Sequence, residues 1–229
     1  ITFVGSSAVA EAVYKLAARH GKRVQALGGA KNHLVVLPDA DLERSLPALI
    51  GSCFGCAGQR CLAGSVVIAV GDAQRQDALR DAFVAAARKL VPGDGLDEDA
   101  TLPPVIGPEQ KAKVEQWIEQ GVRDGAQLIL DGRNTAVASR PHGCFVGATV
   151  FDRVTPEMPI AQEEVFGPVV NFMRAKDLDE AIDISNRTRF GNSASLFTQN
   201  GAAARRFRER VQCGMLGINL GVPAPMAMF

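Results

Sequence analysis

The sequence predicts an α/β fold, in which a mostly parallel sheet carries helices on both of its faces. Short apolar segments alternate along the chain with longer segments whose apolar residues recur at helical spacing. Gly, Pro and Asp residues separate the two kinds of segment. This alternation is typical of parallel sheets, because a connection between parallel strands crosses the sheet, usually through a helix.

In the first half of the chain, an apolar strand leads into a small-residue turn and a helix that Gly21 ends. Further on, Asp41 and Asp72 precede apolar residues at helical spacing and are expected to open two more helices. The strands expected in this half are 1–4, 23–27, 34–37 and 66–70, and the helices are 8–20, 41 through 50 or beyond, and 72–90.

In the second half, residues 91–107 are rich in Gly, Pro and Asp and predict a loop. The helix after this loop carries Trp117 and Ile118 on its apolar face, and Gly125 ends it. The strands expected in this half are 127–130, 145–151, 169–174, 194–198 and 215–219, and the helices are 108–124, 178–186 and 202–211.

The composition is that of a globular protein with room for one large or two small domains. The chain has 229 residues, 47% of them hydrophobic, and 25 basic residues balance 25 acidic ones. A net charge of zero argues against nucleic acid as the main partner, because that partner requires a basic face. No apolar run approaches the roughly 20 residues of a membrane span, so a membrane is not expected as a partner either.

The cysteines do not form a recognisable disulfide or metal pattern. The chain has five, at positions 53, 56, 61, 144 and 213, and no signal peptide precedes them, so we expect a reducing, cytoplasmic compartment. Cys53-x-x-Cys56 invites a zinc or redox interpretation. Structural zinc needs four ligands, however, and no histidine lies near, while Cys53 falls inside an expected helix. No metal site is expected.

The sharpest chemical signal is Gly58-Gln59-Arg60-Cys61, within a run of small residues. Small neighbours let a substrate approach the sulfur closely, and a cation beside a thiol favours the reactive thiolate. Taken alone, such a cysteine is more often a small buried hydrophobe than a nucleophile. Cys61 is therefore a candidate nucleophile that needs support from other segments.

Three other segments are weak signals when each is taken alone. Gly5-Ser6-Ser7, between a strand and a helix, is a place where backbone N–H groups can meet a phosphate. Gly28-Gly29 follows a strand, and Glu163-Glu164-Val165-Phe166-Gly167-Pro168 sets two carboxylates beside an aromatic ring and a turn. Strand–Gly–helix turns and solvated acidic loops are common in α/β proteins, so the alternative to a site is an ordinary turn or loop.

In this order and spacing, the four segments together resemble the NAD(P)-dependent aldehyde dehydrogenase family, over essentially all 229 residues. The resemblance implies that Cys61 is the nucleophile and that Arg60 holds a substrate carboxylate. It implies NAD as the cofactor, held by these residues: Gly5, Ser6, Leu27, Gly28, Glu164 and Phe166. It also implies that residues 1–26 end the NAD-binding domain, 27–220 form the catalytic domain and 221–229 begin a return segment.

The segment from Val24 to His33, VQALGGAKNH, resembles the CoA-acylating, methylmalonate-semialdehyde dehydrogenase branch of that family. Most hydrolytic members have Glu at the position of Ala26, where it activates the deacylating water; a CoA thiol has less need of a base. The implied reaction oxidises methylmalonate or malonate semialdehyde with NAD, which becomes NADH, releases the carboxylate as CO₂ and transfers the acyl group to coenzyme A, giving propionyl-CoA or acetyl-CoA. Two alternatives remain open, a hydrolytic member of another branch and a non-catalytic folded module.

The resemblance also implies what surrounds these residues in a complete enzyme. The chain corresponds to roughly the second half of such an enzyme, which implies a homo-oligomer at full length and an inactive chain in isolation. Ala10 stands where many relatives have a second glycine of the cofactor turn. Of the expected oxyanion donors, the chain offers the backbone N–H of Cys61.

Overall fold

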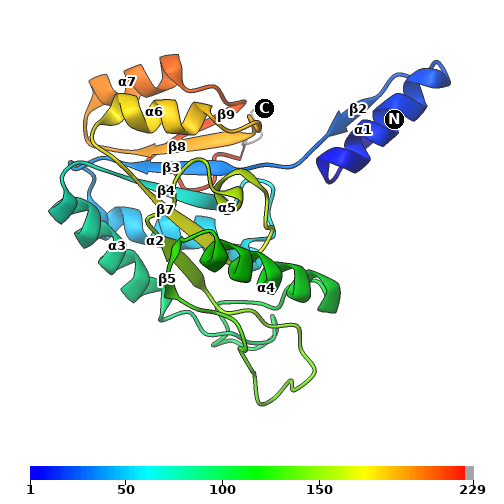
Figure 1. Ribbon diagram of the computed structural model, residues 1–229, viewed down its shortest axis with the longest axis horizontal. Coiled ribbons are helices and arrows are strands. Elements are labelled where there is room, and N and C mark those ends of the chain that lie inside the picture. The colour runs from blue at the N-terminus through cyan, green and yellow to red at the C-terminus, as the bar shows by residue number, and fades with distance from the viewer. Residues whose placement is uncertain (225–229) are drawn as a thin grey trace. The chain divides into compact units, whose positions relative to one another are not determined.

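The computed structural model describes residues 1–224 and divides the chain into two compact units, Ile1–Ala30 and the chain from Lys31 onward. In the first unit, β1 (Thr2–Val4) and β2 (Gln25–Leu27) pair in parallel, and α1 (Ser7–Arg19) connects them (Figure 1). The strand–helix–strand order expected for this segment is confirmed. Among residues 1–224, no helix is long and apolar enough to cross a membrane.

The second unit is built on a seven-stranded sheet with the order β5-β6-β7-β4-β3-β8-β9. All neighbouring pairs are parallel except β5 and β6, which are antiparallel. The mostly parallel sheet predicted from the alternation is therefore confirmed. Its strands are β3 (Asn32–Val36), β4 (Gly64–Val70), β5 (Gln127–Leu130), β6 (Thr149–Asp152), β7 (Val169–Ala175), β8 (Ser193–Phe197) and β9 (Met215–Ile218).

Helices cover both faces of this sheet. The connection from β3 to β4 runs toward the β5 edge, whereas those from β7 to β8 and from β8 to β9 run toward the β9 edge. Right-handed connections in opposite directions place their helices on opposite faces, and Figure 1 shows α2 and α3 apart from α6 and α7. The helices are α2 (Leu42–Phe54), α3 (Ala73–Ala87), α4 (Pro108–Arg123), α5 (Pro159–Gln162), α6 (Leu178–Asn186) and α7 (Gly201–Arg210), with a 3₁₀ turn, η1 (Gly55–Gly58), after α2.

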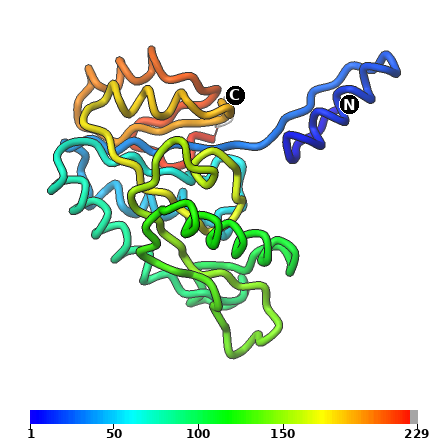
Figure 2. The backbone as a smooth tube through the Cα atoms, in the orientation of Figure 1, coloured from blue at the N-terminus to red at the C-terminus, as the bar shows by residue number. Residues whose placement is uncertain are grey.

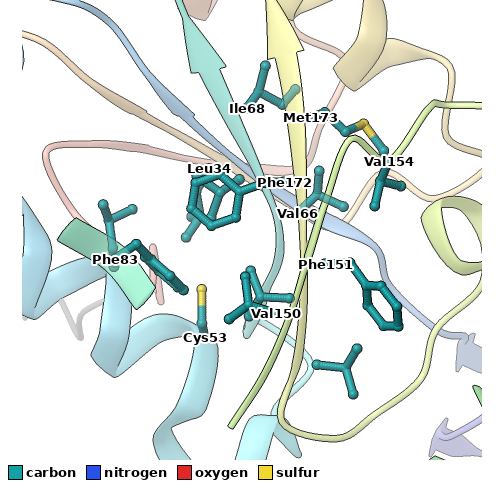
Figure 3. Packing of buried hydrophobic residues seen from close by; sticks show 14 of the residues in the cluster. Leu34, Cys53, Val66, Ile68, Phe83, Val150, Phe151, Val154, Phe172 and Met173 are labelled. Atoms are coloured by element: carbon teal, nitrogen blue, oxygen red, sulfur yellow. The ribbon is translucent and has the colours of Figure 1, made fainter. Parts of the chain in front are cut away.

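Side chains from both helix layers and the sheet form one apolar core. Phe54 of α2, Phe83 of α3 and Phe172 of β7 are fully buried and contact one another in sequence, the first pair tilted and the second edge-to-face, with ring centroids 5.8 and 5.1 Å apart. Met173, the next residue of β7, lies on the other side of the sheet, near Val154 (Figure 3). Both faces of the central strands are therefore buried, which explains why their sequences read as continuous apolar runs.

The strand expected over residues 145–151 begins later, at Thr149. The connection after β5 leaves the sheet and returns (Figure 2), and within it the Gly147 N–H donates to the Gly132 carbonyl at 2.8 Å. Phe145 and Val146 are buried. Their apolar character therefore comes from packing beneath this loop rather than from pairing in the sheet.

β3 begins at Asn32, two residues before the expected start at Leu34. The difference has a physical cause, because Lys31, Asn32 and His33 are polar yet only 2–3% exposed. A buried strand normally reads as an apolar run, and buried polar side chains interrupt that pattern. Lys31 and Asn32 donate hydrogen bonds to backbone carbonyls of neighbouring loops, as described below.

We expect His33 to make the protein sensitive to mild acid. Burial, with the charge of Lys31 adding to it, lowers the pKa of His33 to about 4, whereas the unfolded chain protonates near pH 6.5. His33 therefore does not lower the free energy of unfolding above pH 6.5. As the pH falls from 6.5 toward 4, the unfolded chain binds a proton that the folded protein does not, and the free energy of unfolding falls by about 3 kcal/mol. Urea unfolding at pH 7 and pH 4 should show a smaller loss for His33→Gln than for wild type. The exposed His142→Gln is the control, and equal losses in all three proteins would contradict the assignment.

Candidate active site

Cys61 is exposed and lies three residues before β4, on a turn with an unusual backbone. Cys56 and Ala57 both adopt left-handed conformations, with φ of 54° and 52°, and Gly58 follows at 68°. Non-glycine residues in this region store conformational strain, which the surrounding structure must support, and such residues cluster at functional sites. The strained backbone therefore marks this turn as a candidate functional site rather than an ordinary surface loop.

Gly58 brings the cysteine turn, residues 56–61, against the acidic loop of residues 163–168. A Cβ atom at Gly58 would lie 2.1 Å from the Gly167 carbonyl oxygen, so the two backbones touch where only glycine fits. The structure thus brings together two of the segments that the sequence singled out, Gly58-Gln59-Arg60-Cys61 and Glu164-Val165-Phe166-Gly167-Pro168.

The acidic loop is itself held in shape. Gln110 of α4 donates from its amide to the Val165 and Phe166 carbonyls, at 3.1 and 2.8 Å. Phe166 has a left-handed φ of 55° and a partly exposed ring. Glu163 pairs with Arg189 at 2.6 Å.

Lys31 also holds the acidic loop through hydrogen bonds to backbone carbonyls. Its buried ammonium group donates to the Ile160 and Glu163 carbonyls, both at 2.8 Å. Burial lowers the pKa of Lys31 to about 7, and the charges of Glu164 and Glu163 oppose that shift. Lys31 therefore links the acidic loop to the start of β3 through hydrogen bonds and through charge.

The next residue, Asn32, holds the cysteine turn. Its amide nitrogen donates to the Cys61 and Ala63 carbonyls, each at 2.8 Å, and its amide oxygen accepts from the Ser193 N–H at 3.1 Å. Asn192 donates to the same Cys61 carbonyl at 2.7 Å. Among residues 1–224, no partner is found for the Cys61 backbone N–H. That N–H is therefore available to a substrate oxygen.

Arg60 lies half-buried beside Cys61 and points back toward the end of α2. One guanidinium nitrogen donates to the Gly51 and Ser52 carbonyls, and Nε is buried without a partner in the described part of the chain. Arg60 thus anchors the cysteine turn to the C-terminal carbonyls of α2, where a cation is favoured. A role toward substrate stays a prediction.

The cysteines near Cys61 differ sharply in accessibility. Burial raises the pKa of the Cys53 thiol, although the charge of Arg60 opposes the shift, whereas Cys56 and Cys61 are exposed. Within residues 1–224, no group of three or more His, Cys, Asp or Glu side chains is arranged to hold a metal ion.

If Cys61 is the nucleophile, iodoacetamide at neutral pH should alkylate Cys61 fastest, and burial should make Cys53 the slowest, by a factor of at least about ten. Cys213 should also react slowly, because burial raises its pKa. Peptide mapping at low labelling measures the order. Faster labelling of the exposed Cys56 than of Cys61 would contradict an activated thiol at position 61.

In the first unit, the two glycine segments lie side by side. The Gly5 N–H donates to the Leu27 carbonyl at 3.1 Å, and the Gly29 N–H donates to the Ser7 hydroxyl at 3.2 Å. A Cβ atom at Gly28 would lie 2.8 Å from that hydroxyl. Ser6 occupies the N-cap position of α1, and its side chain makes no capping hydrogen bond. Its hydroxyl therefore remains free for a ligand at the start of this helix.

Four residues that matter here were not identified from the sequence: Lys31, Asn32, Gln110 and Asn192. Each acts by donating from its side chain to a backbone carbonyl far away in the sequence. For Lys31 and Asn32, the available signal was the run of polar residues Lys31-Asn32-His33 directly before an apolar strand.

An exposed cysteine on a strained turn of a mostly parallel α/β fold indicates a candidate active site of the class that uses a thiol nucleophile. The aldehyde dehydrogenase family model matches residues 1–229. The chain is 50% identical to malonate-semialdehyde dehydrogenase of Halalkalibacterium halodurans and 51% identical to malonate-semialdehyde dehydrogenase 2 of Geobacillus kaustophilus. It is covered completely in both comparisons and covers 46% and 47% of those proteins.

Solved structures agree. Methylmalonate-semialdehyde dehydrogenase of Oceanimonas doudoroffii matches with a TM-score of 0.95 and 44% identity, over 99% of this chain and 46% of that one. Betaine aldehyde dehydrogenase of Staphylococcus aureus, solved in complex with NAD⁺, matches with a TM-score of 0.92 and 28% identity, over 98% and 44%. The chain belongs to the aldehyde dehydrogenase family, as the sequence motifs predicted, and it spans about half the length of these relatives.

Proposed function

We propose that the full-length protein oxidises malonate or methylmalonate semialdehyde with NAD⁺ and transfers the acyl group to coenzyme A. The observation that carries this proposal is Cys61, exposed, with a free backbone N–H, and held against the Glu164 loop. The identity of about 50% to malonate-semialdehyde dehydrogenases supports the choice of substrate.

The residues of the first unit fit a dinucleotide. The unused Ser6 hydroxyl at the N-terminus of α1 suits a pyrophosphate, and Gly5 beside it carries no side chain. Gly28, with Leu27 beside it, would let the nicotinamide half approach closely. Glu164 would bond the nicotinamide ribose, and Phe166 would pack nearby. NAD⁺, when bound, supplies the hydride acceptor that converts the thiohemiacetal into a thioester.

Cys61 carries the substrate covalently through the reaction. The thiolate adds to the aldehyde carbon, and the Cys61 N–H donates to the oxyanion that forms. After loss of the hydride, the acyl group is a thioester on Cys61. The thioester carbonyl accepts the electron pair of the departing carboxylate, so that CO₂ leaves and a proton takes its place. The CoA thiol then attacks the carbonyl, which releases acyl-CoA and the Cys61 thiolate.

We further infer that residues 1–26 belong to an NAD-binding domain and 27–220 to the catalytic domain. Residues 221–229 would begin a return segment, of which 225–229 lie outside the described residues. Subunit assembly into a homo-oligomer would require the part of the relatives that this chain does not span.

An assay of NADH formation with and without CoA tests the proposal. Acetyl-CoA or propionyl-CoA as the product supports it, whereas equal rates without CoA and a free acid product would indicate the hydrolytic alternative. Titration of NAD⁺ into the 229-residue chain tests the other alternative, because absence of binding would favour a non-catalytic module.

Arg60→Lys tests whether Arg60 grips the substrate carboxylate. Losing a bidentate, charge-assisted contact of about 1.5–3 kcal/mol would lower kcat/KM roughly 10- to 150-fold for semialdehydes but little for propanal. If Arg60 mainly promotes the thiolate, both aldehydes should lose equally, and the loss should shrink as pH rises. Measurements with both substrates at two pH values separate these outcomes. Equal losses would contradict the carboxylate role.

A further inference from the structure

The Cys61 carbonyl is the meeting point of two side-chain amides that come from two different strands. Asn32 begins β3, and Asn192 stands immediately before β8, the strand that pairs with β3 in parallel. Cys61 itself lies just before β4, on the other side of β3. Three neighbouring strands thus converge on one peptide group at the amino edge of the sheet.

The arrangement satisfies the Cys61 carbonyl and the Asn32 side chain. A carbonyl oxygen has two lone pairs, and the Cys61 oxygen uses them for the donors at 2.8 and 2.7 Å. Asn32 spends both of its N–H bonds on the Cys61 and Ala63 carbonyls. Its oxygen faces the Ser193 N–H, so its orientation is fixed by the network. Such a satisfied, 3%-exposed amide is rigid.

We propose that Asn32 and Asn192 are positioning residues for the nucleophile: their amides clamp the Cys61 carbonyl and thereby fix the Cα from which the thiol and the oxyanion-binding N–H project. The inference rests on the proposed function for its catalytic consequence. Catalysis needs thiol and N–H placed together relative to the reacting carbon, and misplacement of about 1 Å is costly.

Asn192 is the better residue to test, because it is half-buried and its loss leaves fewer groups unsatisfied than loss of Asn32 would. Asn186→Ala is a matched control. Asn186 also donates to a backbone carbonyl, of Arg210 at 3.0 Å, and accepts from the Gln212 N–H at 2.8 Å, but it joins α6 to the end of α7. Both variants remove one carboxamide that bonds to backbone.

In the full-length protein, Asn192→Ala should lower kcat/KM for the semialdehyde about tenfold or more, which corresponds to about 1.4 kcal/mol. The affinity for NAD⁺ should stay unchanged, and Asn186→Ala should keep wild-type activity. Asn192→Asp adds a readout that a merely structural role would not move. A carboxylate repels the Cys61 carbonyl, whereas a neutral carboxyl group donates to it. The activity of this variant relative to wild type should therefore rise as the pH falls.

Hydrogen exchange in the same proteins separates failure of the clamp from failure of the proposed function. The Ala63 N–H, bonded to the Arg60 carbonyl at 3.0 Å, should exchange at least tenfold faster in Asn192→Ala than in wild type or Asn186→Ala. Faster exchange in a protein without dehydrogenase activity would leave the clamp standing and overturn the proposed function. Unchanged exchange would overturn the clamp. Faster exchange with undiminished kcat/KM, or a pH-independent deficit in Asn192→Asp, would overturn the positioning role.

Discussion

Replacing Cys61 by serine in the full-length protein is expected to lower NADH formation from malonate semialdehyde at least about a thousandfold. A serine hydroxyl is a far weaker nucleophile than a thiol near neutral pH, unless a base activates it. The substitution should not disturb folding, because the side chain is exposed and the contacts to Asn32 and Asn192 use the backbone carbonyl.

Cys56→Ser is the matched control for this experiment. Cys56 is exposed like Cys61 and lies on the same strained turn, yet the account gives it no chemical role. Its replacement should leave the rate within about twofold of wild type, as for most surface substitutions. A Cys61→Ser protein that kept a tenth of the wild-type rate would exclude Cys61 as the nucleophile.

Gly58→Ala is expected to produce the largest loss of stability among the glycine positions of the site. Alanine is disfavoured at the left-handed φ of 68°, and its Cβ would overlap the Gly167 carbonyl, at 2.1 Å. The two effects together should lower the free energy of unfolding by about 2–4 kcal/mol. Activity should fall as well, because the overlap forces the cysteine turn away from the Glu164 loop.

Gly125→Ala isolates the backbone contribution. Gly125 is also left-handed, with φ of 92°, but nothing lies within 4 Å of an added Cβ. Its replacement should cost only about 1 kcal/mol. Urea unfolding of the two variants measures the difference. Equal losses would mean that the contact between Gly58 and Gly167 contributes nothing to holding the loops together.

The parts of the fold that local pattern controls could be predicted. The apolar runs of β4 and β7 and the amphipathic helix before β5 lie where expected. Phe145 and Val146 misled the prediction, because burial under a loop produces the same apolar pattern as burial in a sheet. The predicted range of β3 starts two residues too late for the opposite reason, since the first residues of this strand are polar and buried.

The same distinction applies to the site. Cys61 and the Glu164 segment carry recognisable motifs, and the structure brings the two loops together through Gly58 and Gly167. Asn32 and Asn192 carry no motif, because their partners are backbone carbonyls that any residue supplies. Which carbonyl an amide reaches depends on strand order in the sheet, and a sequence read locally does not contain that order.

The central claim, that Cys61 carries the acyl group before CoA receives it, is tested most directly by mass spectrometry of the enzyme. Malonate semialdehyde and NAD⁺ would be added to the full-length protein without CoA, and peptides would be mapped after rapid quenching. The account predicts an acyl thioester on the Cys61 peptide, one NADH per subunit in the first turnover, and discharge to acyl-CoA when CoA is added. An acyl group on another residue, or one lost to water at the same rate with and without CoA, would contradict it.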